Sequence, residues 1–325
     1  MTASSLSPFI VEVTRGPAVE SRHAVHAVVM NGQGEIVAAF GDPHRPTFPR
    51  SSIKPLQALA LVESGAADAF ALSDAELALA CASHSGEEKH TSAVAAWLSR
   101  LGLDETALEC GAHAPYAAPE SPPSILCNNC SGKHAGMVTL SLFLKKDHTG
   151  YTDFSHPVQE MIFKTMGEMC GAVITPAICG VDGCSAPNPC LSLENIARGF
   201  AAFMTGRGLS QTRAAACRRL FGAMTRYPDL VGGTGRLDTL LMQAGRGQIL
   251  SKTGAEGVYA CVAPEQDLVI VLKAEDGAKR AAEAALYALM ERFHIAGDHV
   301  LETIQPIALP VLKNWRGIDV GTIRV

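Results

Sequence analysis

Apolar residues at both ends of the chain form the short, dense runs that are typical of strands. Three runs lie near the N-terminus: residues 9–14, 23–30 and 35–40. Three more lie in the last third: residues 248–253, 257–263 and 268–274. Turn sequences, Asn31-Gly32-Gln33-Gly34 and Pro264-Glu265-Gln266-Asp267, separate neighbouring runs. The pattern predicts one antiparallel sheet built from the N- and C-terminal segments.

Between these runs the apolar positions recur every three to four residues, which is typical of amphipathic helices. The expected helices are residues 52–63, 74–82, 87–101, 133–145, 157–170, 193–203 and 211–223, and one more, 277–293, follows the last strand. Pro55 falls in the first turn of the first helix, where a missing N–H removes no hydrogen bond. We therefore predict an α+β fold: an antiparallel sheet flanked by helices, with residues 52–225 mostly helical. Residues 1–325 should form a single catalytic unit.

The composition narrows the class of protein. Of 325 residues, 47% are hydrophobic and 18% charged, which favours a packed core over extended disorder. A net charge of -5 gives no basic surface for nucleic acid. Residues 1–10 lack the features of a secretion signal, and no apolar run reaches the roughly 20 residues that a bilayer requires. We expect a cytoplasmic protein with a small-molecule partner, without membrane association, whose ten cysteines are reduced or bind a metal.

A Ser-x-x-Lys sequence, Ser51 to Lys54, lies at the start of the first predicted helix. Residues three apart share a helix face, so the two side chains can meet. A neutral lysine can remove the proton of a serine hydroxyl, which turns the serine into a nucleophile. The alternative is a helix cap beside a solvated lysine.

Two distant segments favour the chemical interpretation. Lys252 begins a Lys-Thr-Gly sequence, which is the partner motif of Ser-x-x-Lys in penicillin-recognising enzymes. The glycine of this motif, Gly254, would let a substrate approach the edge of the strand. A third segment, Ala-Ser-His-Ser-Gly-Glu-Glu, contains Ser83 and Ser85. We interpret Ser85 as a helix cap that forms a capping box with Glu88, which leaves Ser83 for chemistry.

Cysteines raise the question of a metal site. Cys127 and Cys130 form a Cys-x-x-Cys, but no second copy of that motif exists, although Cys184 offers a thiol in a turn-rich loop. The spacing alone leaves metal binding and buried structural thiols as equal alternatives.

Taken together, five segments resemble the rhizobial-type, or class 3, L-asparaginases, in order from about residue 10 to 295. They are Arg-Ser-x-x-Lys-Pro, Ala-Ser-His-Ser-Gly-Glu, Asn-Asn-Cys-Ser-Gly-Lys-His-Ala-Gly, Val-Asp-Gly-Cys and Ser-Lys-x-Gly-Ala-Glu-Gly. The resemblance implies a fold like that of serine beta-lactamases and glutaminases, a homodimer, and hydrolysis of L-asparagine to L-aspartate and ammonia.

The resemblance also assigns residues by position. It implies two catalytic pairs, Ser51 with Lys54 and Ser83 with Lys252. It implies a zinc site as well, with three ligands: Cys130, Lys133 and Cys184. Asp182 and His134 flank these ligands and would orient them or the substrate.

We expect Ser51 to attack the amide, Lys54 to take its proton, and Ser83 with Lys252 to relay protons and help keep Lys54 neutral. Arg50 would hold the substrate carboxylate, because a guanidinium binds that group in a bidentate way. Zinc would support substrate binding rather than activate water. The alternatives are a glutaminase, a penicillin-recognising serine hydrolase, or a metal-binding protein without catalysis.

Overall fold

A computed structural model describes residues 6–325, so residues 1–5, part of the segment in which we expect no secretion signal, lie outside it. Its main feature is an eight-stranded antiparallel sheet, with strand order β11-β12-β1-β2-β10-β9-β8 and β3 also paired with β2. The strands are β1 (Phe9–Arg15), β2 (Ala18–Asn31), β3 (Ile36–Phe40), β8 (Leu250–Gly254), β9 (Val258–Ala263), β10 (Leu268–Ala274), β11 (Val311–Lys313) and β12 (Asp319–Arg324). Both ends of the chain contribute, which confirms the predicted α+β fold.

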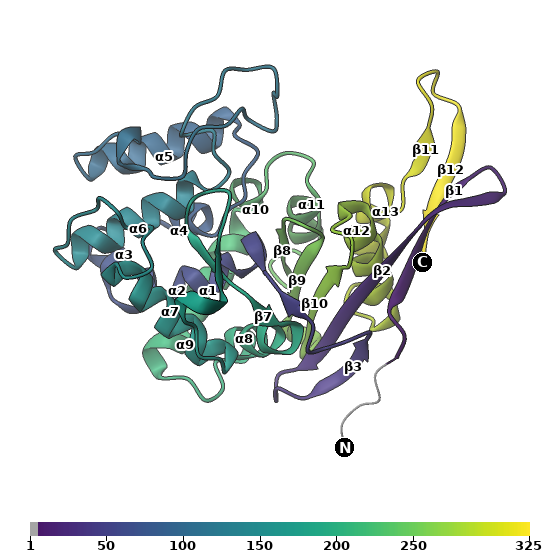
Figure 1. The fold of residues 1–325 in the computed structure, drawn as a ribbon, viewed down its shortest axis with the longest axis horizontal. Helices are drawn as coiled ribbons and strands as arrows, with labels where there is room; N and C mark the ends of the chain where they lie inside the picture. Colours follow the sequence, from purple (N-terminus) through teal and green to yellow (C-terminus); the bar gives the residue numbers. More distant parts are fainter. Residues whose placement is uncertain (1–5) are drawn as a thin grey trace.

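Helices cover both faces of the sheet (Figure 1). The region between β3 and β8 contains α1 (Lys54–Gln57), α2 (Leu59–Glu63), α3 (Ala66–Ala69), α4 (Asp74–Ala80), α5 (Glu88–Arg100), α6 (Ser131–Phe143), α7 (Pro157–Cys170), α8 (Leu193–Thr205), α9 (Gln211–Arg226), α10 (Pro228–Val231) and α11 (Leu237–Ala244). After the sheet come α12 (Lys279–Arg292) and α13 (Asp298–Ala308). Within residues 6–325, no helix is long and apolar enough to cross a lipid bilayer.

Short elements connect these parts. They are the 3-10 helices η1 (Arg50–Ile53), η2 (Glu105–Ala107), η3 (Pro176–Ile178) and η4 (Pro264–Gln266), and the strand pairs β4 (Pro46–Thr47) with β7 (Leu191–Ser192) and β5 (Cys179–Val181) with β6 (Pro187–Pro189).

The central strands are buried on both sides. In β10, Val269 and Val271 face the core shared with the helical region, whereas Ile270 and Leu272 face the core shared with α12. Successive side chains of a strand point to opposite faces, so a strand covered on both faces needs apolar residues at every position. This explains why these strands read as continuous apolar runs.

Three local expectations need correction. The helix expected over residues 52–63 is η1 followed by α1 and α2, although Pro55 does lie in a first helical turn. Ser85 does not cap the next helix: its hydroxyl donates to the carbonyl oxygen of Gly232 at 2.9 Å, and α5 begins at Glu88 after Glu87. The strands after residue 297 were not predicted, because β11, at the sheet edge, and its neighbour β12 have mostly exposed side chains and no apolar run.

Candidate functional site

Strand β8 and helix η1 lie against each other, which brings two of the predicted segments together. Arg50 opens η1 with a φ of 52°, in the left-handed region that residues other than glycine rarely adopt. Gly254 ends β8 and allows the close approach, because a Cβ there would lie 2.5 Å from the Pro49 carbonyl oxygen. Such backbone strain is concentrated at functional sites. The segment that presents Ser51 is thus held in a tight, strained position.

Ser83 lies between two buried lysines. Its Oγ is 3.2 Å from Nζ of Lys54 and 2.9 Å from Nζ of Lys252. Lys54 also donates to the carbonyl oxygen of Ala82 and lies 3.1 Å from Sγ of Cys130. A hydroxyl can accept one hydrogen bond and donate another, so Ser83 can pass a proton when one lysine is neutral.

Ser51 and Ser83 line the same cleft, which has a volume of about 400 Å³. The other lining residues are Tyr116, Asn129, Arg236, Thr253, Gly254, Ala255, Glu256, Gly257, Gly277 and Lys279. Ser51 is half-buried, whereas Ser83 is only 4% exposed. Within the described part of the chain, no hydrogen bond joins Ser51 to Lys54, since the Lys54 ammonium group reaches Ser83 instead. The structure therefore places the two serines at one cleft, and both buried lysines contact Ser83 rather than Ser51.

Burial lowers the pKa of Lys252 from 10.5 to about 7, because a charged group is poorly solvated inside the protein. The positive charges of Lys54 and Arg236 lower this pKa further, and Asp238 opposes them. Asp238 also fixes the strand, since it accepts hydrogen bonds from the Ser251 hydroxyl at 2.7 Å and the Thr253 N–H at 3.0 Å. Near neutral pH, a large share of Lys252 is thus a free base.

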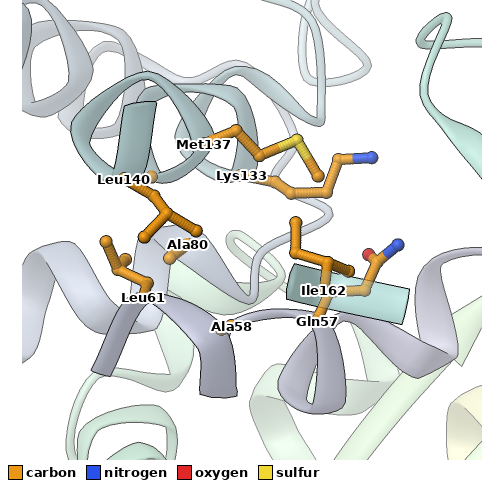
Figure 2. A pocket seen from close by; sticks show the side chains of 9 residues that line it. Gln57, Ala58, Leu61, Ala80, Lys133, Met137, Leu140 and Ile162 are labelled. Carbon is orange, nitrogen blue, oxygen red and sulfur yellow. The ribbon is translucent and has the colours of Figure 1, made fainter. Parts of the chain in front are cut away.

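A cluster of sulfur and nitrogen atoms lies behind the lysines. Lys133 Nζ is 3.1 Å from Sγ of Cys184, and Cys130 donates a hydrogen bond to Cys184. This bond is the main cause that holds the pKa of Cys184 well below its usual value, and the Lys133 charge adds to it. Figure 2 shows the Lys133 stem along a small cavity between α6 and the α1–α2 segment.

The cluster has the donor atoms of a metal site. No group of three or more His, Cys, Asp or Glu side chains among residues 6–325 could hold a metal ion. Cys130 and Cys184 supply two such ligands, and the third expected ligand, Lys133, is a residue type outside that set. All ten cysteines are free thiols, and the three ligand side chains are buried. Lys133 contacts Cys184, and it could donate to a metal only after losing its proton, whereas the charges of Cys184 and Cys130 raise its pKa against the effect of burial.

His134 packs beside this cluster. Its Nδ1 lies 2.6 Å from the hydroxyl of Tyr151, and burial lowers its pKa although the neighbouring Cys184 opposes that shift. His134 does not line the cleft that contains the serines.

Arg50 and Asp182 form an ion pair. Nε and a terminal guanidinium nitrogen of Arg50 lie 2.9 and 2.8 Å from one carboxylate oxygen of Asp182. Both residues line a cavity next to the cleft, together with Asn188, Glu256 and Lys273. Asp182 thereby ties the loop that carries Cys184 to the segment that presents Ser51.

Sequence reasoning gave no chemical role to Asp238, Arg236 or Asn129, although the loop of residues 232–238 was a candidate to close over the site. Asp238 and Arg236 belong to the Gly-Gly-Thr-Gly-Arg-Leu-Asp sequence, whose glycines indicate a loop but not where it folds. Asn129 lies between Cys127 and Cys130, and nothing in that local pattern distinguishes it from a structural loop residue. Only the approach of these segments to β8 and η1 gives them a place at the cleft.

Comparison with known proteins gives the family. The L-asparaginase II family matches residues 11–325. Among solved structures, the chain is similar to a beta-lactamase from Mycobacterium bovis, with a TM-score of 0.48 and 14% identity over 83% of this chain and 94% of the other. A Bacteroides dorei protein, provisionally described as a beta-lactamase, has a TM-score of 0.40 and 13% identity over 82% of this chain and 84% of its own. No curated protein sequence matches the chain. Because the family match includes the whole cleft and the thiol cluster, this chain belongs to the L-asparaginase II family of amidohydrolases.

Proposed function

We propose that this protein hydrolyses L-asparagine to L-aspartate and ammonia through a serine ester. The proposal rests on one observation: the Ser83 hydroxyl lies within hydrogen-bond distance of two buried lysines, at a cleft that Ser51 also lines. A low lysine pKa beside a hydroxyl is the arrangement that a serine-lysine hydrolase needs.

In this mechanism Ser51 is the nucleophile, because it is the more exposed of the two serines and follows the strained Arg50. Its Oγ attacks the amide carbon and loses its proton to Ser83, while Ser83 passes its own proton to neutral Lys252. We propose Lys252 rather than Lys54 as the base, because its contact with Ser83 is the shorter one and its pKa is lowered to about 7. Lys54 donates to Ser83 and helps keep Lys252 neutral.

The reaction is completed by the same groups. Lys252 returns its proton to the leaving nitrogen, the carbon–nitrogen bond breaks, and ammonia departs. A water molecule then loses a proton to Lys252 through Ser83 and attacks the aspartyl ester. Lys252 returns that proton through Ser83 to the Ser51 oxygen as the carbon–oxygen bond of the ester breaks, which releases L-aspartate and restores the Ser51 hydroxyl.

The proposed assay separates the candidate activities. Purified protein should release ammonia from L-asparagine faster than from L-glutamine and should leave a chromogenic beta-lactam intact. Faster turnover of glutamine or of the beta-lactam would replace this proposal with one of those alternatives. Zinc binding without amide hydrolysis would favour the non-catalytic metal protein.

The pH dependence tests the role of Lys252. We expect kcat/KM to rise with pH through an inflection near 7, because Lys252 accepts a proton only after it has lost its own. Asp238→Asn removes a charge that raises this pKa, so the inflection should move to lower pH. Rates measured between about pH 5 and 9 check both expectations. A profile without an inflection, or a shift to higher pH in the variant, would contradict the assignment.

We also propose a zinc ion held by Cys130, Lys133 and Cys184. When bound there, the metal would position the substrate, and His134 with Asp182 would support the ligand-bearing segments. Lys54 connects Ser83 to the thiol cluster, because its Nζ contacts both Ser83 and Cys130.

Cys184→Ser should abolish stoichiometric zinc, since a serine hydroxyl is a far weaker zinc ligand than a thiolate. Metal content is measured by mass spectrometry of the purified protein. Cys217→Ser changes a buried thiol of α9 outside the cluster and should keep the zinc content of the wild type. Equal zinc in Cys184→Ser and wild type would refute the ligand assignment.

The site draws on η1, the loop after α4, the start of α6 and strand β8. Because its residues come from both the sheet and the helical region, we propose that residues 1–325 act as one catalytic unit. The homodimer and the cytoplasmic location stay predictions.

A further inference from the structure

Resting on the proposed function, we propose that Arg236 binds the α-carboxylate of the substrate and that Glu256 binds its α-ammonium group. The cleft would then recognise a free α-amino acid rather than an amide in general. In L-asparagine both charged groups are attached to the carbon two bonds from the amide carbon. Groups that recognise them must therefore line the same cleft as the nucleophile.

Arg236 forms no ion pair in the described part of the chain, although its charge acts on Glu283. Two cations line the cleft, Arg236 and Lys279. Lys279 lies 3.0 Å from a carboxylate oxygen of Glu283, whereas no ion pair or side-chain hydrogen bond involves Arg236 within residues 6–325. Arg236 is nonetheless half-buried. Removing a guanidinium partly from water without an ion-pair partner costs free energy. A carboxylate ligand would offset that cost, because it can accept two parallel hydrogen bonds from the guanidinium.

The other candidate for the carboxylate is already engaged. Arg50, which we expected to hold this group, is paired with Asp182 and lines the adjacent cavity instead of the cleft. Burial is the main cause of the low pKa of Lys252, and the charge of Arg236 adds to it, so Arg236 lies near the proposed base. An anion bound by Arg236 would thus lie beside the reacting groups.

Glu256 supplies the opposite charge. It is the carboxylate among the residues that line the cleft, and it stands in the turn between β8 and β9 with a φ of 59°. Its side chain is exposed and makes no ion pair in the described part of the chain. Lys273 donates to the backbone oxygen of Glu256 at 2.7 Å and not to its carboxylate. The carboxylate is therefore available to an ammonium group.

Three substrates separate the two contacts. L-asparagine carries both charges, succinamate lacks the ammonium group, and β-alaninamide lacks the carboxylate. We expect Arg236→Gln to lower kcat/KM by about 10- to 100-fold for L-asparagine and succinamate, but by less than about threefold for β-alaninamide. Glu256→Gln should lower kcat/KM for L-asparagine and β-alaninamide, which carry the ammonium group, and leave kcat/KM for succinamate unchanged. Arg236→Lys keeps the charge and should recover part of the loss.

The matched control is Arg246→Gln, which removes an exposed arginine outside the cleft and should leave all three substrates unchanged. An equal loss for all three substrates in Arg236→Gln, or no loss, would overturn the inference. Calorimetric titration with L-aspartate provides a readout that needs no turnover: Arg236→Gln should bind this product about 10- to 100-fold more weakly than wild type. If wild-type protein releases no ammonia from L-asparagine, the proposed function fails, and the titration still decides whether Arg236 binds the carboxylate.

Discussion

Replacing Ser51 with alanine should reduce the turnover of L-asparagine by about 10⁴-fold or more, because the ester intermediate cannot form without its oxygen. The variant should fold normally, since Ser51 is half-buried and makes no side-chain hydrogen bond within residues 6–325. Substrate binding should also survive, so the loss should appear in kcat and not in KM. Steady-state ammonia release measures the effect.

Ser52→Ala is the matched control for this variant. Ser52 is the buried neighbour whose hydroxyl donates to the Pro49 carbonyl oxygen at 2.7 Å, so its loss should cost about 1 kcal/mol of stability while the enzyme stays active. Ser83→Ala should also be severely impaired, because the proton path to Lys252 is broken. If Ser51→Ala keeps its turnover and mass spectrometry finds the trapped acyl group on Ser83, then Ser83 is the nucleophile.

Lys252→Met should have opposite effects on activity and stability. Activity should fall by about 10³-fold or more with the loss of the base. The free energy of unfolding should increase by about 2 kcal/mol at pH 7, because lowering the Lys252 pKa from 10.5 to about 7 costs about 5 kcal/mol, and hydrogen bonds to Ser83 and Thr253 return part of it. Activity assays and chemical denaturation measure the two effects.

The sign of the stability effect depends on pH. Below a pH of about 7 both folded and unfolded Lys252 are charged, and the cost of burying the charge is complete. Between about 7 and 10.5 the unfolded chain binds more protons at this lysine, so wild-type stability rises with pH and the advantage of Lys252→Met shrinks. Lys164→Met, at an exposed position of α7, should show no such trend. A less stable Lys252→Met variant at pH 7 would contradict the argument.

Most of the central elements, and the kinds of residue that could react, follow from the local sequence. Apolar periodicity is a local property, so it predicted α7 (Pro157–Cys170) at its observed bounds and β9 and β10 within one residue. Ser-x-x-Lys and Lys-Thr-Gly named the chemical groups. Ser85 shows where local reading fails, because its hydroxyl donates to the carbonyl oxygen of Gly232, 147 positions away, and Glu87 stands at the start of α5 instead.

The contacts between the two serines and the two lysines depend on the tertiary structure. Lys252 and Ser83 are 169 residues apart in sequence, and no local pattern predicts that both lysines contact Ser83 while Ser51 stands in the cleft beside it. The lowered pKa of Lys252 likewise arises from burial and from charges on separate segments. Arg50 is the same kind of case, since its partner Asp182 is 132 residues away. A residue's type is written in the sequence, but its solvation and its partners exist only once the chain has folded.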